Sequence, residues 1–286
     1  MLNKIGSSEL IQALPHIRTL RGKTVVVKYG GSAMINAELK KAVIDDIVFT
    51  AAVGIRVVLV HGGGPEIDAV LKAVGKEIRF VDGLRYTDED TMNIVQMVLC
   101  GKVSKDICAL IHGAGAQAVG LCGLDGGLLE AVRVKADGLG MVGEIRRVNR
   151  DFLEKTLDSG SIPVISSVAM GIGEDAGKSL NVNADTVAAV IAAALAAEKL
   201  VLVTDVRGIL RNVLEPDSLI GTVSRRELDE LRNAGILSKG MIPKSECCAL
   251  ALDGGVKKAH IIDGRIPHSL LTELFTDEGV GTLITG

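Results

Sequence analysis

The stretch TVVVKYGG, Thr24–Gly31, places the strongest constraint on how this chain folds. A run of valines leads into Lys28, and Gly30 and Gly31 follow at once. The run predicts a short buried strand, because β-branched residues in a continuous apolar run favour one. Ligands of open α/β sheets bind outside the carboxyl ends of strands, so a cation beside a glycine turn there suits a phosphate. A solvated lysine before an ordinary turn is the alternative for this stretch taken alone.

Length, charge and composition narrow the class of protein. The 286 residues suffice for one large α/β domain or two lobes. A net charge of −3 and an aromatic content of 2% argue against nucleic acid as a partner. The five cysteines form no C-x-x-C pair, and we interpret them as reduced. The start has no long apolar core, and the run Val187–Ala197 is too short to cross a bilayer. We expect a cytoplasmic protein with no membrane partner.

Strand-like and helix-like segments alternate along the chain, which predicts an α/β fold with a mainly parallel sheet covered on both faces. The segments Leu128–Val134 and Val142–Val148 break the alternation and are expected to form a hairpin. Besides the run ending at Lys28, the expected strands are Arg56–Val60, Ile162–Ser166, Leu200–Thr204, Ala259–Ile262 and Thr282–Thr285. The expected helices are Ser8–Leu20, Ala37–Val53, Thr87–Ile111, Thr186–Ala197, Ser224–Ala234 and Ser269–Phe275.

Local signals refine these helices. Pro15 is expected to kink or split the first helix, and Thr87 is expected to cap the long one. The glycine pattern of Gly113–Gly120 follows a helix rather than a strand, so we interpret it as a helix end and a strand start, not as a dinucleotide fingerprint. The composition shift near Ser166–Lys178 is the best candidate for a boundary between lobes.

A second glycine turn, HGGGP, follows the strand Arg56–Val60. Pro65 and the glutamate after it indicate the start of a helix. Bare backbone N–H groups at a strand end and a helix start attract anions. The turn is therefore a candidate anion site, although a tight strand–helix connection would use the same residues.

Four further side chains stand near strand ends or helix starts. Arg85 lies between two turn signals and suits either solvent or a bidentate clamp on a carboxylate. Asn181 and Asp185, with Asn183 between them, alternate just before a helix, so their side chains could converge. On local evidence Asp185 is more commonly just the N-cap. Lys244 lies at a helix N-terminus, where the dipole favours anions, so an anion held by both would resolve the conflict.

These parts suit phosphoryl transfer, which needs positioning and charge neutralisation more than covalent chemistry. The chain has no G-x-x-x-x-G-K-[ST] motif and no H-R-D or D-F-G set, which excludes P-loop enzymes and protein kinases. No Ser-His-Asp pattern is evident, and the five histidines do not cluster.

Six segments in this order resemble the amino-acid kinase family, and more narrowly the N-acetyl-L-glutamate kinases of arginine biosynthesis. They are VVVKYGGSAM, VVLVHGGGPEID, VDGLRYTD, LNVNADTVA, LVTDVRGIL and SKGMIPK. The resemblance implies a three-layer αβα sandwich and transfer of the ATP γ-phosphoryl group to the side-chain carboxylate of N-acetylglutamate. It also implies three parts: a helical extension at 1–20, an amino-acid lobe that also dimerises at 21–178, and an ATP lobe at 179–286.

The same resemblance implies roles for individual residues. Lys28 and Lys244 would stabilise the transferring phosphoryl group, and Asp185 would hold both lysines. N-acetylglutamate would lie against Gly63, Gly64, Arg85 and Asn181, with Arg85 on its α-carboxylate. Gly30, Gly31 and Gly63 would donate backbone N–H groups to phosphate or substrate. Phosphate or nucleotide would also contact Thr204, Asp205, Arg207 and Gly208. Mg²⁺ would be held largely by ATP oxygens and water, with no metal site built from side chains. The acceptor carboxylate ionises near pH ~4.3, so no general base is required.

The first helix carries an apolar stripe, Leu10, Ile11, Leu14, Ile17 and Leu20, which must pack on its own chain or on the same helix of another subunit. This segment and the C-terminal stretch from His260 resemble the arginine-inhibited N-acetylglutamate kinases. That resemblance implies a hexamer built as a trimer of dimers and inhibition by L-arginine. The candidate arginine contacts are His268, Glu278 and Gly281; a surface acidic turn is the alternative for Glu278.

Other classes remain open at this point. A dinucleotide-dependent oxidoreductase would need a glycine fingerprint that is missing. A non-catalytic amino-acid sensor on the same fold would be expected to lack the two lysines, and both are present. Within the enzymes, another amino-acid kinase acting on a different carboxylate is the alternative.

Overall fold

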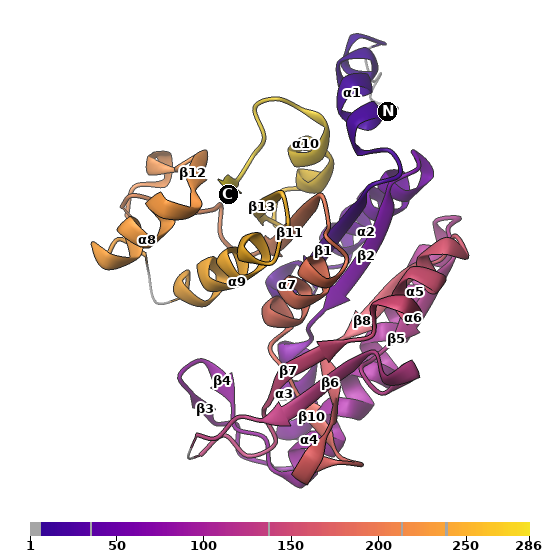
Figure 1. Cartoon of the computed structure of the whole chain (residues 1–286), viewed down its shortest axis with the longest axis vertical. Helices are drawn as coiled ribbons and strands as arrows, with labels where there is room; N and C mark the ends of the chain where they lie inside the picture. The colour runs from indigo at the N-terminus through magenta and orange to yellow at the C-terminus, as the bar shows by residue number, and fades with distance from the viewer. Residues whose placement is uncertain (1–6, 35, 137, 213, 238–239) are drawn as a thin grey trace.

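The computed structural model describes residues 7–34, 36–136, 138–212, 214–237 and 240–286, without the side chains at 7–10, 32, 33 and 216. Its centre is an eight-stranded sheet of order β12-β14-β13-β11-β1-β2-β8-β5 (Figure 1). The six strands from β13 to β5 are mutually parallel, and β14 runs antiparallel to β13. The strands are β1 Thr24–Tyr29, β2 Arg56–His61, β5 Ala118–Leu121, β8 Ile162–Ser166, β11 Lys199–Thr204, β12 Thr222–Ser224, β13 Lys258–Asp263 and β14 Thr282–Thr285. The predicted mainly parallel sheet is confirmed.

Helices cover both faces of this sheet, because alternate residues of the central strands enter two different cores. Val25 and Val27 pack in one core and Val26 in the other. The Val26 face is covered by α6 Arg150–Asp158, α7 Ala184–Ala194, α8 Arg225–Asn233 and α9 Ile242–Asp253. The Val25 face is covered by α2 Ala37–Ala52, α3 Gly64–Ala73, α4 Glu89–Gln96, α5 Ser104–Gly113 and α10 Ser269–Phe275.

Two smaller sheets flank the carboxyl end of the large one. The first has the order β10-β9-β6-β7 and contains the predicted hairpin as antiparallel β6 and β7. Its strands are β6 Leu129–Arg133, β7 Gly143–Val148, β9 Val168–Gly171 and β10 Ser179–Asn181. The second is the short hairpin β3 Phe80–Val81 and β4 Leu84–Arg85, which projects beside α3 in Figure 1.

The structure corrects three local predictions. The first helix, α1 Ser7–Leu20, continues through Pro15 without a break. The helix expected over Thr87–Ile111 is α4 and α5 joined by a π-helical turn, Met97–Val103. Its N-cap is Asp88, whose carboxylate accepts from the Thr91 N–H at 2.8 Å, and not Thr87. The Thr87 hydroxyl instead donates to the Arg85 carbonyl at 2.8 Å, so it serves the loop before the helix.

The apolar stripe of α1 is divided between two environments. Leu20 is buried and Ile17 packs on the core that contains α2 and α10. Ile11 and Leu14 are 69% and 40% exposed, and the side chain of Leu10 lies outside the described part. Figure 1 shows α1 standing away from the body of the molecule beside α10. Ile11 and Leu14 therefore leave much of their apolar surface uncovered by the described residues of this chain.

Candidate active site

Two lysines and one aspartate from three separate elements meet at the carboxyl end of the central strands. Lys28 Nζ, from β1, lies 2.9 Å from Asp185 Oδ1, and Lys244 Nζ, from the start of α9, lies 3.2 Å from Asp185 Oδ2. Lys28 and Asp185 are buried, with 9% and 6% of their surfaces exposed. Each carboxylate oxygen thus faces one ammonium group, so Asp185 holds the two cations on either side of itself.

The local sequence explains how each group reaches this place. Lys28 lies two residues after Val26, on the face against which α7 and α9 pack. Asn183 caps α7, because its side chain accepts from the N–H groups of Asp185 and Thr186. The N-cap interpretation of Asp185 is therefore wrong. Its carboxylate is left free to pair with the lysines.

The charges of this cluster are interdependent. Burial alone would raise the pKa of Asp185, but the charges of Lys28 and Lys244 and their hydrogen bonds outweigh burial and lower it. Two cations and one anion leave a net charge of +1, and the N-terminus of α7 adds to the positive potential. Lys244 at a helix start is tolerated because Asp185 is beside it. The cluster is suited to an anionic ligand.

The two glycine turns approach this cluster closely. A Cβ atom at Gly30 would lie 2.8 Å from Lys28 Nζ, so any larger residue there would displace the lysine. Gly31 has a φ of +76°, and a Cβ on it would lie 4.0 Å from Asp205, which belongs to the loop after β11. In the second turn, a Cβ at Gly63 would lie 2.7 Å from a methyl group of Leu99. Both turns require glycine for steric reasons.

A cavity of about 190 Å³ opens between the second glycine turn and the start of α7. Its polar lining brings together the four residues that the sequence assigns to the amino-acid substrate: Gly63, Gly64, Arg85 and Asn181. The backbone of Asn183 and Ala184 also lines it, and Asp185 follows directly in the chain. The predicted substrate residues therefore share one cavity that adjoins the lysine–aspartate cluster.

Arg85 is held in place before any ligand arrives. Its Nη1 lies 2.6 Å from Asp68 Oδ1, its Nη2 donates to the Gly64 carbonyl at 3.5 Å, and its guanidinium lies 4.7 Å from the centre of the Phe80 ring. The side chain is buried. Asp68 ends the segment VVLVHGGGPEID, but the sequence assigns it no role. Its position four residues after Gly64, on the first turns of a predicted helix, is the signal that could have found it.

Asn181 is fixed through the loop that precedes α4. Its amide donates to the Thr87 hydroxyl at 3.1 Å, and that hydroxyl donates to the Arg85 carbonyl. The Asn181 backbone N–H donates to the Met141 carbonyl at 2.9 Å. Thr87 therefore links the Asn181 side chain to the Arg85 backbone, a role that the sequence did not indicate.

Four of the residues that the sequence assigns to phosphate or nucleotide lie at the end of β11 or in the turn that follows it. Thr204 is buried at the strand end and its hydroxyl accepts from the Val206 N–H at 3.0 Å. Asp205 and Arg207 are exposed. Gly208 has a φ of +145°, and a Cβ there would lie 2.5 Å from the Thr282 hydroxyl. The turn lies beside Gly31, which the sequence assigns to the same ligand.

The three arginine candidates lie near the other end of the chain. His268 Nδ1 is 2.6 Å from the buried carboxylate of Asp46, and Glu278 is exposed. The Gly281 N–H donates to Glu273 Oε2 at 3.1 Å. His16 of α1 lies 3.3 Å from the Asp277 carboxylate, in the loop between α10 and β14. The first helix thus contacts the loop that carries Glu278.

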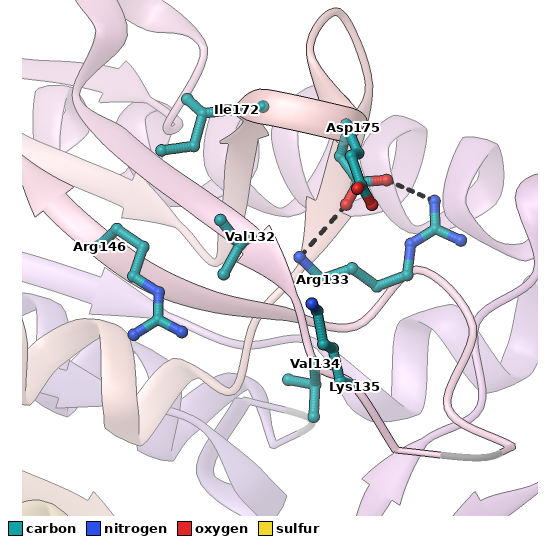
Figure 2. Close-up of a pocket in the computed structure, with 9 residues that line it drawn as sticks. Val132, Arg133, Val134, Lys135, Arg146, Ile172 and Asp175 are labelled. Carbon is teal, nitrogen blue, oxygen red and sulfur yellow. Dashed lines mark hydrogen bonds and ion pairs between the residues drawn. The ribbon is translucent and has the colours of Figure 1, made fainter.

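A second, larger cavity of about 580 Å³ lies on the small sheet and contains none of the predicted residues. Figure 2 shows its wall of β6 side chains and the ion pair of Arg133 with Asp175, 2.6 Å long. The basic side chains Arg133 and Arg146 are each paired, the latter with Glu144 at 2.9 Å. Size alone does not make this cavity the active site, because the lysine–aspartate cluster lies at the other one.

Comparisons with known proteins agree with this geometry. Residues 23–263 match the Amino acid kinase family. Acetylglutamate kinase of Nostoc sp. is 55% identical over 97% of this chain and 92% of its own, and that of Moorella thermoacetica is 53% identical over 96% and 95%. Among solved structures, N-acetylglutamate synthase from Neisseria gonorrhoeae, complexed with coenzyme A and N-acetyl-glutamate, superimposes with a TM-score of 0.85 at 32% identity. The match covers 98% of this chain and 63% of that synthase.

A more distant structure supports the fold alone. Carbamate kinase from Giardia lamblia, bound to AMP-PNP, has a TM-score of 0.67 at 18% identity over 92% of this chain and 98% of its own. No helix among the described residues is long and apolar enough to cross a membrane. With the full-length matches, these findings identify the family: the chain belongs to the amino acid kinase family and, within it, to the acetylglutamate kinases.

Proposed function

We propose that this chain transfers the γ-phosphoryl group of ATP to the side-chain carboxylate of N-acetyl-L-glutamate, giving N-acetyl-L-glutamyl 5-phosphate for arginine biosynthesis. The observation that carries the proposal is the pairing of Lys28 and Lys244 with Asp185 beside a cavity lined by Arg85 and Asn181. Membership in the acetylglutamate kinases supplies the substrate. Because both lysines are held in place, we favour a catalyst over a non-catalytic sensor.

The reaction needs no proton transfer. The acceptor carboxylate, with an ordinary pKa of about 4.3, is already ionised at neutral pH. One of its oxygens forms a bond to the γ-phosphorus while the bond from that phosphorus to the β–γ bridging oxygen breaks, and ADP leaves with the electron pair. Negative charge grows on the transferring and leaving oxygens, where Lys28 and Lys244 neutralise it from two sides. The ion pairs with Asp185 hold both ammonium groups in position.

The residues that line the substrate cavity orient the amino acid. Arg85 binds the α-carboxylate, with Asp68 holding its Nη1 side and leaving other N–H groups for the ligand. Asn181 and the backbone at Gly63 and Gly64 complete the contacts. Thr87 connects the Asn181 amide to the Arg85 backbone, which supports the placement of both residues around the amino acid.

Nucleotide binding is assigned to the two loops that meet at Gly31 and Asp205. Gly30, Gly31, Thr204, Asp205, Arg207 and Gly208 would surround the phosphates and the nucleoside. Among the described residues, no group of three or more His, Cys, Asp or Glu side chains could hold a metal. We propose that Mg²⁺ is carried by ATP oxygens and water, where it would supply further charge neutralisation. We also propose that the protein works in the cytoplasm. Its five cysteines are free thiols, which a reducing compartment preserves.

A substrate panel tests the function. Wild-type protein with MgATP is offered N-acetyl-L-glutamate, L-glutamate, N-acetyl-L-aspartate and carbamate, with ADP release and hydroxylamine-trapped acyl hydroxamate measured together. We expect hydroxamate only with N-acetyl-L-glutamate, in step with ADP. Preference for another acceptor would assign the chain to a different amino-acid kinase activity, and ADP without hydroxamate would reject transfer to a carboxylate.

We extend the proposal to assembly and regulation. The exposed Ile11 and Leu14 on α1 suit pairing with the same helix of another subunit about a two-fold axis. Linking dimers in this way gives a hexamer, a trimer of dimers. L-arginine would bind near His268, Glu278 and Gly281, and the contact of His16 with Asp277 offers a route from that loop to α1. The exposed carboxylate of Glu278 is the right partner for a guanidinium.

A further inference from the structure

His61 is the one group with acid–base chemistry at the end of β2 that the mechanism does not use. It is fully buried and pairs in register with Tyr29 on β1 and Ser166 on β8. Burial lowers its pKa to about 4, so the imidazole is neutral at physiological pH. It does not line the substrate cavity, whereas the next three residues, Gly62–Gly64, all do. His61 therefore lies directly behind the glycine turn.

The hydrogen bonds of His61 define one tautomer. Its Nδ1 is 2.8 Å from the Gly62 carbonyl oxygen, and its Nε2 is 3.0 Å from the Ser166 hydroxyl. A carbonyl can only accept, so Nδ1 must carry the proton. In a neutral ring Nε2 must then accept from Ser166. The Ser166 hydroxyl has only one proton, and it donates that proton to His61. Its longer contact with the Leu99 carbonyl, at 3.2 Å, is then not a hydrogen bond.

This bond fixes the orientation of the Gly62–Gly63 peptide. The Gly62 N–H donates to the Tyr29 carbonyl at 3.1 Å, and the Gly62 carbonyl accepts from His61, so both sides of Gly62 are held. In a trans peptide the carbonyl and the following N–H point in opposite directions. A carbonyl turned back to His61 therefore turns the Gly63 N–H forward. That N–H donates to no described residue.

We propose that His61 is a positioning residue, which as a neutral Nδ1–H tautomer holds the Gly62–Gly63 peptide so that the Gly63 N–H is directed at the reacting phosphoryl oxygens. Ser166 selects the tautomer. Leu99 leaves no room for a side chain at Gly63, because a Cβ there would lie 2.7 Å from its methyl group. The proposal rests on the proposed kinase function, because it needs an anion in front of Gly63. It assigns no proton transfer to His61.

Kinetics of three variants test the role. His61→Leu fills the space but cannot donate, whereas His61→Asn places an amide N–H near the Nδ1 position. Loss of an oxyanion-type donor costs roughly 10²–10³-fold in kcat, and a misdirected donor costs part of that. We expect kcat to fall about 10–100-fold in His61→Leu with both KM values changed by less than about threefold, and to recover to within about fivefold of wild type in His61→Asn. Ser166→Ala should lie between the two.

His112 provides a matched control, because its Nε2 also lies near a backbone carbonyl, 3.2 Å from that of Ala118, away from the cavity. His112→Leu and His112→Asn should leave kcat and KM unchanged. Equal losses in His61→Leu and His61→Asn, or losses that follow the melting temperature across all variants, would reduce His61 to a structural role and overturn the proposal.

The tautomer of His61 can also be measured directly by spectroscopy, independently of enzyme activity. Nitrogen-15 NMR of wild-type protein labelled at histidine should show, near pH 7.5, a neutral His61 ring protonated at Nδ1, assigned by its loss in His61→Asn. A ring protonated at Nε2 could not donate to Gly62 and would overturn the proposal even if the variants fold poorly. Failure of the kinase function itself would appear instead as absent turnover in wild type, whatever the tautomer.

Discussion

Lys28 and Asp185 form a buried ion pair 2.9 Å long between the end of the first strand and the first turn of α7. The pair joins the glycine turn after β1, which is assigned to phosphate, to the helix that follows Asn181, which is assigned to substrate. Lys244 completes the arrangement from α9 at 3.2 Å. A carboxylate between two ammonium groups fixes the distance between the two charges that a transferring phosphoryl group must meet.

Removing either lysine should damage turnover far more than binding. We expect Lys28→Met or Lys244→Met to lower kcat by roughly 10²–10³-fold or more, as loss of other charge-stabilising donors does. Lys23 is an exposed lysine just before β1, so Lys23→Met is the matched control and should leave kcat unchanged. Steady-state kinetics with a melting curve for each variant measures this. A folded variant with near-wild-type turnover would remove that lysine from the mechanism.

Arg85 should govern affinity for the amino acid alone. Lysine cannot reproduce the two-pronged contact with a carboxylate, so Arg85→Lys and Arg85→Ala should both raise KM for N-acetyl-L-glutamate about tenfold or more and leave KM for ATP nearly unchanged. Arg79→Ala is the control, because Arg79 stacks on Tyr86 in the same loop, 4.0 Å from the ring centre. An equal rise for both substrates would count against the clamp.

The exposed half of the α1 stripe should decide assembly. Deleting residues 1–20 should give active dimers that largely lose arginine sensitivity, but it also removes the buried Leu20. The double variant Ile11→Asp with Leu14→Asp tests the interface without touching that core. We expect dimers by sedimentation velocity, retained kinase activity and lost arginine inhibition, whereas Gln12→Asp should remain hexameric. A wild-type protein that sediments as a dimer, or whose rate ignores millimolar arginine, contradicts the proposal.

The pair of Asp46 with His268 predicts a pH dependence of stability. Burial raises the pKa of Asp46 to about 6, against the hydrogen bond and charge of His268. A carboxyl group whose pKa is higher in the folded than in the unfolded chain stabilises the fold most below pH ~4, and this contribution is lost as the pH rises through about 6.

Comparison of wild type with Asp46→Asn across pH 4–8 isolates this effect. The free energy of unfolding of wild type, minus that of the variant, should fall with rising pH by at most about 3 kcal/mol, since each pKa unit is worth about 1.4 kcal/mol. Repeating the comparison in a His268→Gln background removes the charge and the hydrogen bond of the histidine from the comparison. A difference that rises with pH would show that Asp46 is stabilised as the anion.

Local patterns predicted the elements of this fold, but several contacts depend on packing that they do not encode. The valine run placed Lys28 at a strand end, and Pro65 placed the start of the next helix, because both signals lie within a few residues. The pairing of Asp185 with both lysines requires α7 to pack on β1 and α9 at once. The local rule for Asp185 gave the wrong result because Asn183, two residues earlier, took the cap.

The substrate cavity shows the same division. Arg85 was singled out by its position between turns, but its partner Asp68 comes from α3, and Thr87 was assigned to the wrong task. Thr87 accepts from Asn181, which the chain places beside it only through the small sheet. The π-helical turn between α4 and α5 was missed, because apolar periodicity does not distinguish one wide turn inside a long helix.

The most direct test of the central claim follows the oxygen atom that attacks phosphorus. Wild-type protein is incubated with MgATP, hydroxylamine and N-acetyl-L-glutamate labelled with oxygen-18 only in its side-chain carboxylate, and the released phosphate is analysed by phosphorus-31 NMR. Hydroxylamine attacks the acyl carbon, so phosphate leaves with the oxygen that joined it to the substrate. We predict phosphate that carries one oxygen-18 atom. Unlabelled phosphate, or label that appears only when the α-carboxylate is enriched instead, would contradict the proposed transfer.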